Sequence, residues 1–346
     1  MKRQVVTVII VVLCSMRVHA FQPFEPFTFG VIADPHISDA EKDGPDASTK
    51  MYGQSAALLS ATVEELNRLE NLDFTVVLGD LTRDAEPYNI SLFKKIMSAL
   101  RSPYYVILGN HDVNENAVFQ EYQPGQSRAY MIQNFQGHGF EGPDFHWSID
   151  PLANVHLIGL DTTITGDWGG ELNKQGLQFL RQDLEANRGK LTIVLLHHQL
   201  YSYLSPLDSS IPQRYKFTAY NSGQIRFLLQ EFPQVVMTLS GHQHLSTRYI
   251  LEENIAYFAI PSTAVWPMRY VVFSVSPEEI SYRTYDVPGD GEIRLQAKRK
   301  IVAEQIESTA SGKENLPGGL DEAVLFAKLL SSQTETGTIP LQSDWR

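Results

Sequence analysis

The chain has 346 residues, of which 43% are hydrophobic and 20% charged, so it can bury one large core or two smaller ones. Its formal net charge of −12 argues against binding to nucleic-acid polymers or to anionic membranes. The single cysteine, Cys14, excludes an intrachain disulfide framework.

The first 20 residues have the features of a signal peptide. Lys2 and Arg3 precede an apolar run from Val5 to Cys14, and residues 18–20 (VHA) form a pattern that signal peptidase cleaves after. The run is about half of the roughly 20 residues that a membrane-spanning helix needs, so an N-terminal anchor is the less favoured alternative. Cleavage would leave a net charge of −15. We expect a secreted or periplasmic protein with no stable membrane insertion after signal cleavage.

The next part of the chain, up to about residue 290, alternates two kinds of segment. Short apolar runs rich in β-branched residues predict strands at Phe27–Ala33, Phe74–Leu78, Tyr104–Leu108, Val155–Leu160, Leu191–Leu196 and Val235–Leu239. Apolar residues spaced three and four apart predict amphipathic helices at Gln54–Leu69, Tyr88–Leu100, Lys174–Ala186 and Gly223–Glu231. The alternation predicts an α/β domain over residues 21–290 with a largely parallel core.

The pattern changes after residue 247. Short, closely spaced runs at Arg248–Leu251, Ile255–Ile260, Tyr270–Val275 and Ile280–Tyr285 predict antiparallel strands that complete a second sheet. Residues 291–346 are polar, and we expect a loosely attached C-terminal extension with one helix near Asp321–Leu330. Two further segments, Val113–Pro143 and Tyr201–Tyr220, have the composition of long loops, which are binding elements or surface excursions.

Five of the expected strands are followed directly by residues that can bind metal. In chain order these are Asp34-Pro35-His36, Asp80, Asn110-His111-Asp112, His197-His198 and Gly241-His242-Gln243-His244. Ligands of open α/β sheets bind beyond the carboxyl ends of the strands, so these side chains are expected to converge on one crevice. Oxygen and imidazole ligands without sulfur suit Mn, Fe or Zn, and their number suffices for two ions bridged by one carboxylate. The histidines outside these clusters, His138, His146 and His156, are interpreted as structural.

Taken in order, the motifs DPH, GDLTRD, GNHD, HH and GHQH resemble those of the calcineurin-like metallophosphoesterases over residues 27–285. The resemblance implies a four-layer αββα sandwich of two mixed β-sheets flanked by helices, with a centre of two divalent or trivalent metal ions. It implies that Asp34, His36 and His244 hold one metal, that Asn110, His197 and His242 hold the other, and that Asp80 bridges them. His111 would polarise the phosphoryl oxygen or protonate the leaving alkoxide, and Asp112 would orient His111.

Within the family, residues 79–112 are similar to class III cyclic nucleotide and glycerophosphodiester phosphodiesterases. This favours a nucleotide-like or glycerophosphodiester substrate, split by in-line attack of a metal-bound hydroxide. Those enzymes usually have HHPP where this chain has His197-His198-Gln199-Leu200, so the loop that follows differs. Arg83 stands where purple acid phosphatases carry a tyrosine, so an iron–tyrosinate centre is not expected.

Several alternatives stay open. The core motifs are equally compatible with a broad phosphomonoesterase or a nucleotide diphosphate hydrolase, because only the loops select the ester. From another class, a catalytically silent metal-binding module would keep the fold and the metals, although the intact motif set argues against it. Candidates for stacking on a base or binding a phosphate are Tyr201, Tyr203, Arg214 and Tyr220.

Overall fold

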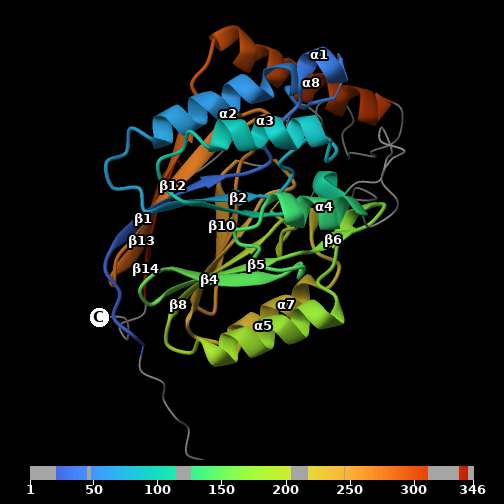
Figure 1. The fold of residues 1–346 in the computed structure, drawn as a ribbon. Coiled ribbons are helices and arrows are strands. Elements are labelled where there is room, and N and C mark those ends of the chain that lie inside the picture. Colours follow the sequence, from blue (N-terminus) through green and yellow to red (C-terminus); the bar gives the residue numbers. More distant parts are fainter. Residues whose placement is uncertain are drawn as a thin grey trace, which may run out of the picture.

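The computed structural model describes residues 21–44, 48–113, 126–203, 217–244, 246–310 and 335–341. Two six-stranded mixed sheets pack face to face within these residues, and helices cover both outer faces (Figure 1). The α/β class and the four-layer αββα sandwich are therefore confirmed. The expected signal peptide (1–20) and the helix expected near Asp321–Leu330 lie outside the described residues.

The first sheet contains the first three strands of the chain. Its order is β14 (Thr336–Pro340), β13 (Glu279–Asp286), β12 (Arg269–Val275), β1 (Phe27–Ile32), β2 (Phe74–Leu78) and β3 (Tyr104–Ile107). The strands β1, β2 and β3 run parallel to one another, whereas β12 is antiparallel to β1, and β13 and β14 continue the antiparallel half.

The second sheet contains the middle strands of the chain. Its order is β10 (Arg248–Glu252), β11 (Ile255–Ala259), β9 (Val235–Ser240), β8 (Leu191–Leu196), β5 (Val155–Leu160) and β4 (Trp147–Leu152). The four inner strands run parallel, and the two edge strands are antiparallel to their neighbours. The parallel core is thus divided between two sheets.

The expectation that the strands after residue 247 complete a single second sheet is wrong. β10 and β11 extend the second sheet, but β12 and β13 cross over to the first. The crossing segment between β11 and β12 is buried along most of its length. Local alternation of apolar residues specifies a strand and its buried faces, but not the neighbour it pairs with, so the sequence pattern could not distinguish the two sheets.

Helices cover each outer face of the sandwich. On the side of the first sheet lie α2 (Tyr52–Leu66), α3 (Pro87–Met97) and, farther along the same side, α8 (Gly291–Ala310) with the short α1 (Ala40–Asp43). On the opposite side lie α5 (Lys174–Ala186) and α7 (Ser222–Gln230) (Figure 1). In α2, Leu59, Val63 and Leu66 repeat at three and four residues and are buried, which is the spacing that predicted the helix.

The strand β8 shows why its sequence is a continuous apolar run. Ile193 and Leu195 belong to the core between the two sheets, whereas Val194 and Leu196 belong to the core beneath α5 and α7. Successive side chains of a strand point to opposite faces, so a strand covered on both faces needs apolar residues throughout. The two sheets meet through pairs such as Phe258 and Phe273, whose ring centroids are 5.0 Å apart.

Parts of the segments expected to be long loops are ordered elements. The helix α4 (Gln126–Asn134) lies inside the segment Val113–Pro143, and most of the segment Tyr201–Tyr220 falls outside the described residues. A hairpin of β6 (Thr163–Ile164) and β7 (Asp167–Gly170), which the sequence pattern did not predict, follows β5. Among the described residues, no helix is long and apolar enough to span a membrane.

The C-terminal extension packs on the domain. The helix α8 starts at Gly291, where the sequence pattern predicted none, and buries Ala297 and Ile301 in the main core. β14 pairs with β13, with Ile339 opposite Ile280. The expectation of a loosely attached tail is therefore wrong for these two elements, while the boundary at residue 290 stays a prediction.

We expect Ile339→Ala to lower the free energy of unfolding by about 2–4 kcal/mol, because Ile339 is 3% exposed and its removal leaves a cavity at the edge of the core. Urea denaturation followed by circular dichroism measures the change. The matched control is Thr338→Ala on the exposed face of the same strand, which should change stability by less than about 0.5 kcal/mol. Equal effects of both substitutions would contradict a packing role for β14.

Candidate metal centre

The carboxyl ends of strands from both sheets meet at one place. Residues after β1, β2 and β3 of the first sheet and after β8 and β9 of the second bring together all seven side chains that the resemblance implied as ligands. They come from Asp34, His36, Asp80, Asn110, His197, His242 and His244. All but Asn110, His242 and His244 are at most 2% exposed, and His242 is 7% exposed. Parallel neighbours end at the same edge of a sheet, which is why such distant residues converge.

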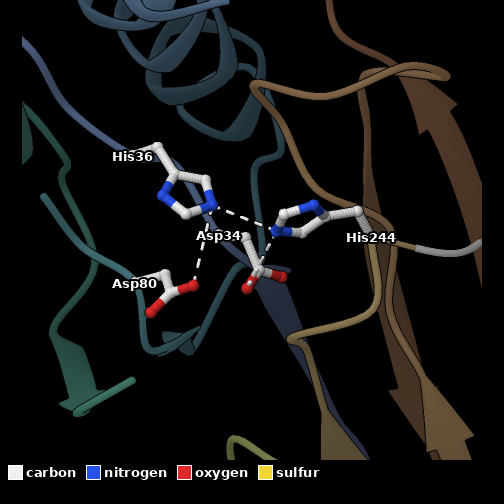
Figure 2. Close-up of side chains that lie close together, drawn as sticks. All are labelled: Asp34, His36, Asp80 and His244. Atoms are coloured by element: carbon white, nitrogen blue, oxygen red, sulfur yellow. Dashed lines mark hydrogen bonds and ion pairs between the residues drawn. The ribbon is translucent and has the colours of Figure 1, made fainter. Parts of the chain in front are cut away.

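Four of these side chains form a first cluster (Figure 2). The Nε2 atoms of His36 and His244 are 3.0 Å apart. Nε2 of His36 lies 3.6 Å from Oδ2 of Asp80, and Nε2 of His244 lies 3.7 Å from Oδ1 of Asp34. Two imidazole nitrogens and two carboxylates thus point at a common position, which is the arrangement that a bound cation needs.

A second cluster shares Asp80 with the first. Nε2 of His197 lies 3.5 Å from Oδ1 of Asp80, 3.2 Å from Nδ1 of His242 and 3.2 Å from Oδ1 of Asn110. Oδ2 of Asp80 faces the first cluster and Oδ1 the second, so a single carboxylate links two groups of ligand atoms. Nδ1 of His197 donates to the carbonyl oxygen of Leu78 over 2.8 Å, which leaves its Nε2 for the cluster.

The backbone at these positions is unusual. Asp34, His36, Asp80, His242 and His244 all have positive φ, between 44° and 71°. Only a few per cent of non-glycine residues adopt this conformation, and it costs on the order of 1 kcal/mol or more each. Such conformations persist where the surrounding fold imposes them. Here five of the seven clustered residues have a positive φ.

Two of the strand-end glycines permit the close approach of these loops. A Cβ on Gly109 would lie 2.3 Å from the backbone nitrogen of Asp80, and a Cβ on Gly241 would lie 2.6 Å from Oδ2 of Asp34. Neither position has room for a side chain. These glycines therefore make room for the neighbouring loops that carry the ligand atoms.

The buried charges of the site fit a cation. Oδ2 of Asp34 has no hydrogen-bond partner although it is fully buried. Burial raises the pKa of Asp34 to about 7, with the charge of His197 opposing and that of Asp80 adding to the shift. Burial also lowers the pKa values of His36, His242 and His244 well below the usual range, so these rings are neutral at pH 7, the form that binds metal. The Oδ2 atom of Asp34 lies among neutral imidazoles without a hydrogen-bond donor, and a bound cation would supply its missing partner.

His111 lies beside the first cluster, with its ring centroid 4.8 Å from that of His36. Its Nδ1 is 2.6 Å from the carbonyl oxygen of Arg83 and 3.2 Å from Oδ1 of Asp84. Because a carbonyl oxygen can only accept, Nδ1 carries a proton and Nε2 is left for a substrate. Burial alone would lower the pKa of His111, but the charge of Asp80 and the hydrogen bond with Asp84 raise it.

The expectation that Asp112 orients His111 is wrong. The Asp112 carboxylate accepts hydrogen bonds from the backbone nitrogens of Leu81, Thr82 and Gly109, at 3.0 to 3.2 Å, and it is fully buried. The 3₁₀ helix η1 (Asn110–Val113) turns the side chain of Asp112 back under the loop that carries Asp80. Asp112 therefore fixes two motifs relative to each other, and Asp84 is the carboxylate that meets the imidazole.

We expect Asp84→Ala to slow turnover roughly 10- to 100-fold with little change in metal content, because the His111 ring loses one of its two Nδ1 partners. Asp84→Asn, whose side-chain oxygen can still accept from Nδ1, should retain more activity. Steady-state kinetics with metal analysis of both variants makes the comparison. Unchanged turnover in Asp84→Ala would contradict this role, which was overlooked because Asp84 is a single acidic residue in a turn.

Lys50 is a second residue that sequence reasoning missed. Its positive charge contributes to lowering the pKa values of His36 and His244. The loop that carries Lys50 is bonded to the C-terminal extension, because Nζ of Lys300 donates to the carbonyl oxygens of Ser48 and Lys50 at 2.9 and 3.1 Å. A cation at this position would favour an anionic substrate.

The tyrosines proposed from the sequence as ligand contacts have contacts within the fold, and their role toward a ligand stays a prediction. The hydroxyl of Tyr203 donates to the carbonyl oxygen of Tyr257 over 2.6 Å, and Tyr201 packs on Tyr257 with a ring distance of 5.1 Å. Tyr220 donates to Oδ2 of Asp167 over 2.9 Å. Arg214 lies outside the described residues.

The three histidines outside the motifs have structural contacts. His138 stacks on Tyr104 with ring centroids 4.0 Å apart, and His146 stacks on Phe179 at 5.5 Å. The ring of His156 lies between the carboxylates of Asp150 and Asp183, each 2.7 Å away. These contacts agree with the structural interpretation of the three residues.

Two facing mixed sheets with clustered aspartates and histidines at their carboxyl ends define a metallophosphoesterase. The sequence profile of the family described as "Calcineurin-like phosphoesterase" matches residues 27–246. The chain therefore belongs to the calcineurin-like phosphoesterase family, whose members are metal-dependent hydrolases, as the sequence motifs predicted.

Curated relatives are phosphodiesterases. The chain is 27% identical to the 3′,5′-cyclic adenosine monophosphate phosphodiesterase CpdA of Haemophilus influenzae, over 79% of this chain and 90% of that protein. It is 29% identical to the glycerophosphodiester phosphodiesterase GpdQ of Enterobacter lignolyticus, over 60% of this chain and 69% of that protein.

Solved structures share the fold. A dimetal phosphatase from Danio rerio superposes with a TM-score of 0.58 at 17% identity, covering 77% of this chain and 98% of its own. A purple acid phosphatase from yellow lupin seeds superposes with a TM-score of 0.56 at 15% identity, covering 78% of this chain and 53% of its own. At these identities the likeness concerns the fold alone.

Proposed function

We propose that this chain is a phosphodiesterase with two metal ions that hydrolyses a nucleotide-like or glycerophosphodiester substrate. The observation that carries the proposal is the Asp80 carboxylate, whose two oxygens face two separate groups of ligand atoms. The activities named for the relatives CpdA and GpdQ favour a diester over a monoester.

Each cluster would hold one ion. Asp34, His36 and His244 would hold the first and Asn110, His197 and His242 the second, with Asp80 between them. The nitrogen and oxygen donors suit Mn, Fe or Zn. When bound, two such ions bind the phosphate and lower the pKa of the attacking water.

The remaining chemistry belongs to the protein. His111, held at Nδ1 by the Arg83 carbonyl and Asp84, presents Nε2 as a proton donor to the alkoxide that leaves. Its raised pKa favours the protonated donor form. Lys50 adds positive charge on the side of the first cluster, which favours the anionic ester.

Hydrolysis of bis-p-nitrophenyl phosphate and p-nitrophenyl phosphate in the presence of Mn tests the proposal. We expect faster turnover of the diester. A clear preference for the monoester would instead identify a phosphomonoesterase, and a panel that includes nucleotide sugars would reveal a nucleotide diphosphate hydrolase. Bound metal without turnover of any ester would identify a silent binding module.

Export is part of the proposal. The sequence of residues 1–20 supports a cleaved signal peptide, which would place the enzyme in the periplasm or outside the cell. N-terminal sequencing of the protein recovered from the host is the test. A mature chain that begins at Phe21 is expected, and a chain that retains Met1 would contradict export by cleavage.

A further inference from the structure

An aromatic pair stands next to the second cluster. The ring centroid of Trp168 lies 6.0 Å from that of His242, the Phe217 ring lies 5.9 Å from His242, and the two aromatic rings are 5.3 Å apart. Trp168 is 37% exposed although its neighbour His242 is buried. The indole therefore forms a flat apolar surface that borders the candidate metal centre and that an incoming molecule can reach.

The position of Trp168 is imposed by the fold. It lies on β7, and the β6–β7 hairpin contacts the 3₁₀ helix η1 that carries Asn110 and His111. Buried His198 reaches the backbone of the hairpin, with Nε2 3.1 Å from the carbonyl oxygen of Trp168 and Nδ1 2.8 Å from Oγ1 of Thr162. A carbonyl oxygen only accepts, so Nε2 of His198 donates to Trp168 and Nδ1 accepts from the Thr162 hydroxyl.

The hairpin is also seated closely on His198. A Cβ on Gly170 would lie 2.2 Å from Nδ1 of His198, so only glycine permits this approach. The second histidine of the HH motif packs its ring against His242, with centroids 4.4 Å apart, while its two nitrogens bond to Trp168 and Thr162 and fix the backbone of Trp168. The contacts of the indole with Phe217 and His242 add to this fixed backbone, so the side chain is prearranged for contact with a ligand.

We propose that Trp168, with Phe217 beside it, is the wall on which a planar group of the substrate packs, so that the enzyme selects diesters that carry a nucleobase over diesters of glycerol. The inference rests on the proposed phosphodiesterase function and makes its substrate class narrower. Stacking on an aromatic face is available to any planar base and to no glycerol moiety, so this contact discriminates between the two classes.

The kinetic test compares two diesters in the Mn-loaded full chain: 3′,5′-cyclic AMP and glycerophosphoethanolamine. Trp168→Ala should lower kcat/KM for cyclic AMP roughly tenfold or more, and that for glycerophosphoethanolamine by less than about twofold. Trp168→Phe should retain most of the wild-type kcat/KM for cyclic AMP. The matched control is Phe227→Ala, which removes an aromatic side chain that is 69% exposed on α7. This variant should leave kcat/KM unchanged for both substrates.

A binding measurement separates this inference from the proposed function. Calorimetric titration of AMP into the Mn-loaded protein should show weaker binding to Trp168→Ala than to the wild type. The factor should be similar to the loss of kcat/KM for cyclic AMP. Equal losses on both diesters, or an AMP affinity independent of Trp168, would overturn the inference. If the wild type splits neither diester, the proposed function fails, and the dependence of AMP affinity on Trp168 still decides whether the aromatic wall binds a base.

Discussion

Asp80→Ala is expected to abolish hydrolysis and to reduce the metal content of the purified protein. Asp80 is shared by the two clusters, with oxygens 3.6 Å from Nε2 of His36 and 3.5 Å from Nε2 of His197. Its removal leaves each cluster with fewer ligands and less negative charge. Two ions stabilise the transition state by several kcal/mol, so the loss of kcat should be at least roughly 10³-fold.

Metal analysis by mass spectrometry and steady-state kinetics measure both effects in the same preparation. Asp73→Ala is a suitable control, because Asp73 is an exposed aspartate that accepts from the backbone of Thr28 at the opposite end of the strands. That variant should bind metal and turn over substrate as the wild type does. Full metal content in Asp80→Ala would show that the clusters do not depend on the shared carboxylate.

His111→Ala should leave the metal content near that of the wild type and slow turnover by roughly 10²–10⁴-fold. The reason for the difference from Asp80→Ala is positional. His111 lies beside the first cluster, but its Nδ1 bonds to Arg83 and Asp84, so it stands outside the two groups of ligand atoms. Its contribution is then to the reaction and not to retention of the ions.

The same two measurements apply to this variant, and His138→Ala provides the control. His138 packs against Tyr104 at the start of β3, away from the carboxyl ends of the strands, so its removal should leave turnover unchanged. Equal loss of metal in His111→Ala and Asp80→Ala would refute the proposed division between the two residues. A loss of turnover that disappears with an activated leaving group such as p-nitrophenol would locate the role of His111 in protonation.

The effects of Asp84→Ala and His111→Ala should not add. Asp84 bonds to the His111 ring, so in the absence of that ring its removal should cost little further activity. A double variant that is no slower than His111→Ala alone is the expected result. Additive losses would assign Asp84 a separate function.

The local sequence determined most of the secondary structure and the chemical nature of the site. β2, β5, β8 and α5 have the predicted bounds because each is specified by its own pattern of apolar residues. The motif residues could likewise be identified before the fold was known, because metal-capable side chains directly follow apolar strands.

Only the tertiary structure decided how these parts are joined. The apolar pattern of β12 does not specify pairing with β1, and the polar sequence near Thr336 does not predict that β14 closes the same sheet. The same applies to side chains: Asp112 adjoins His111 in sequence, yet Asp84 is the residue that meets its ring. Pairing, register and the direction of a side chain depend on contacts between residues that are distant in sequence, and such contacts form only when the sheets pack together.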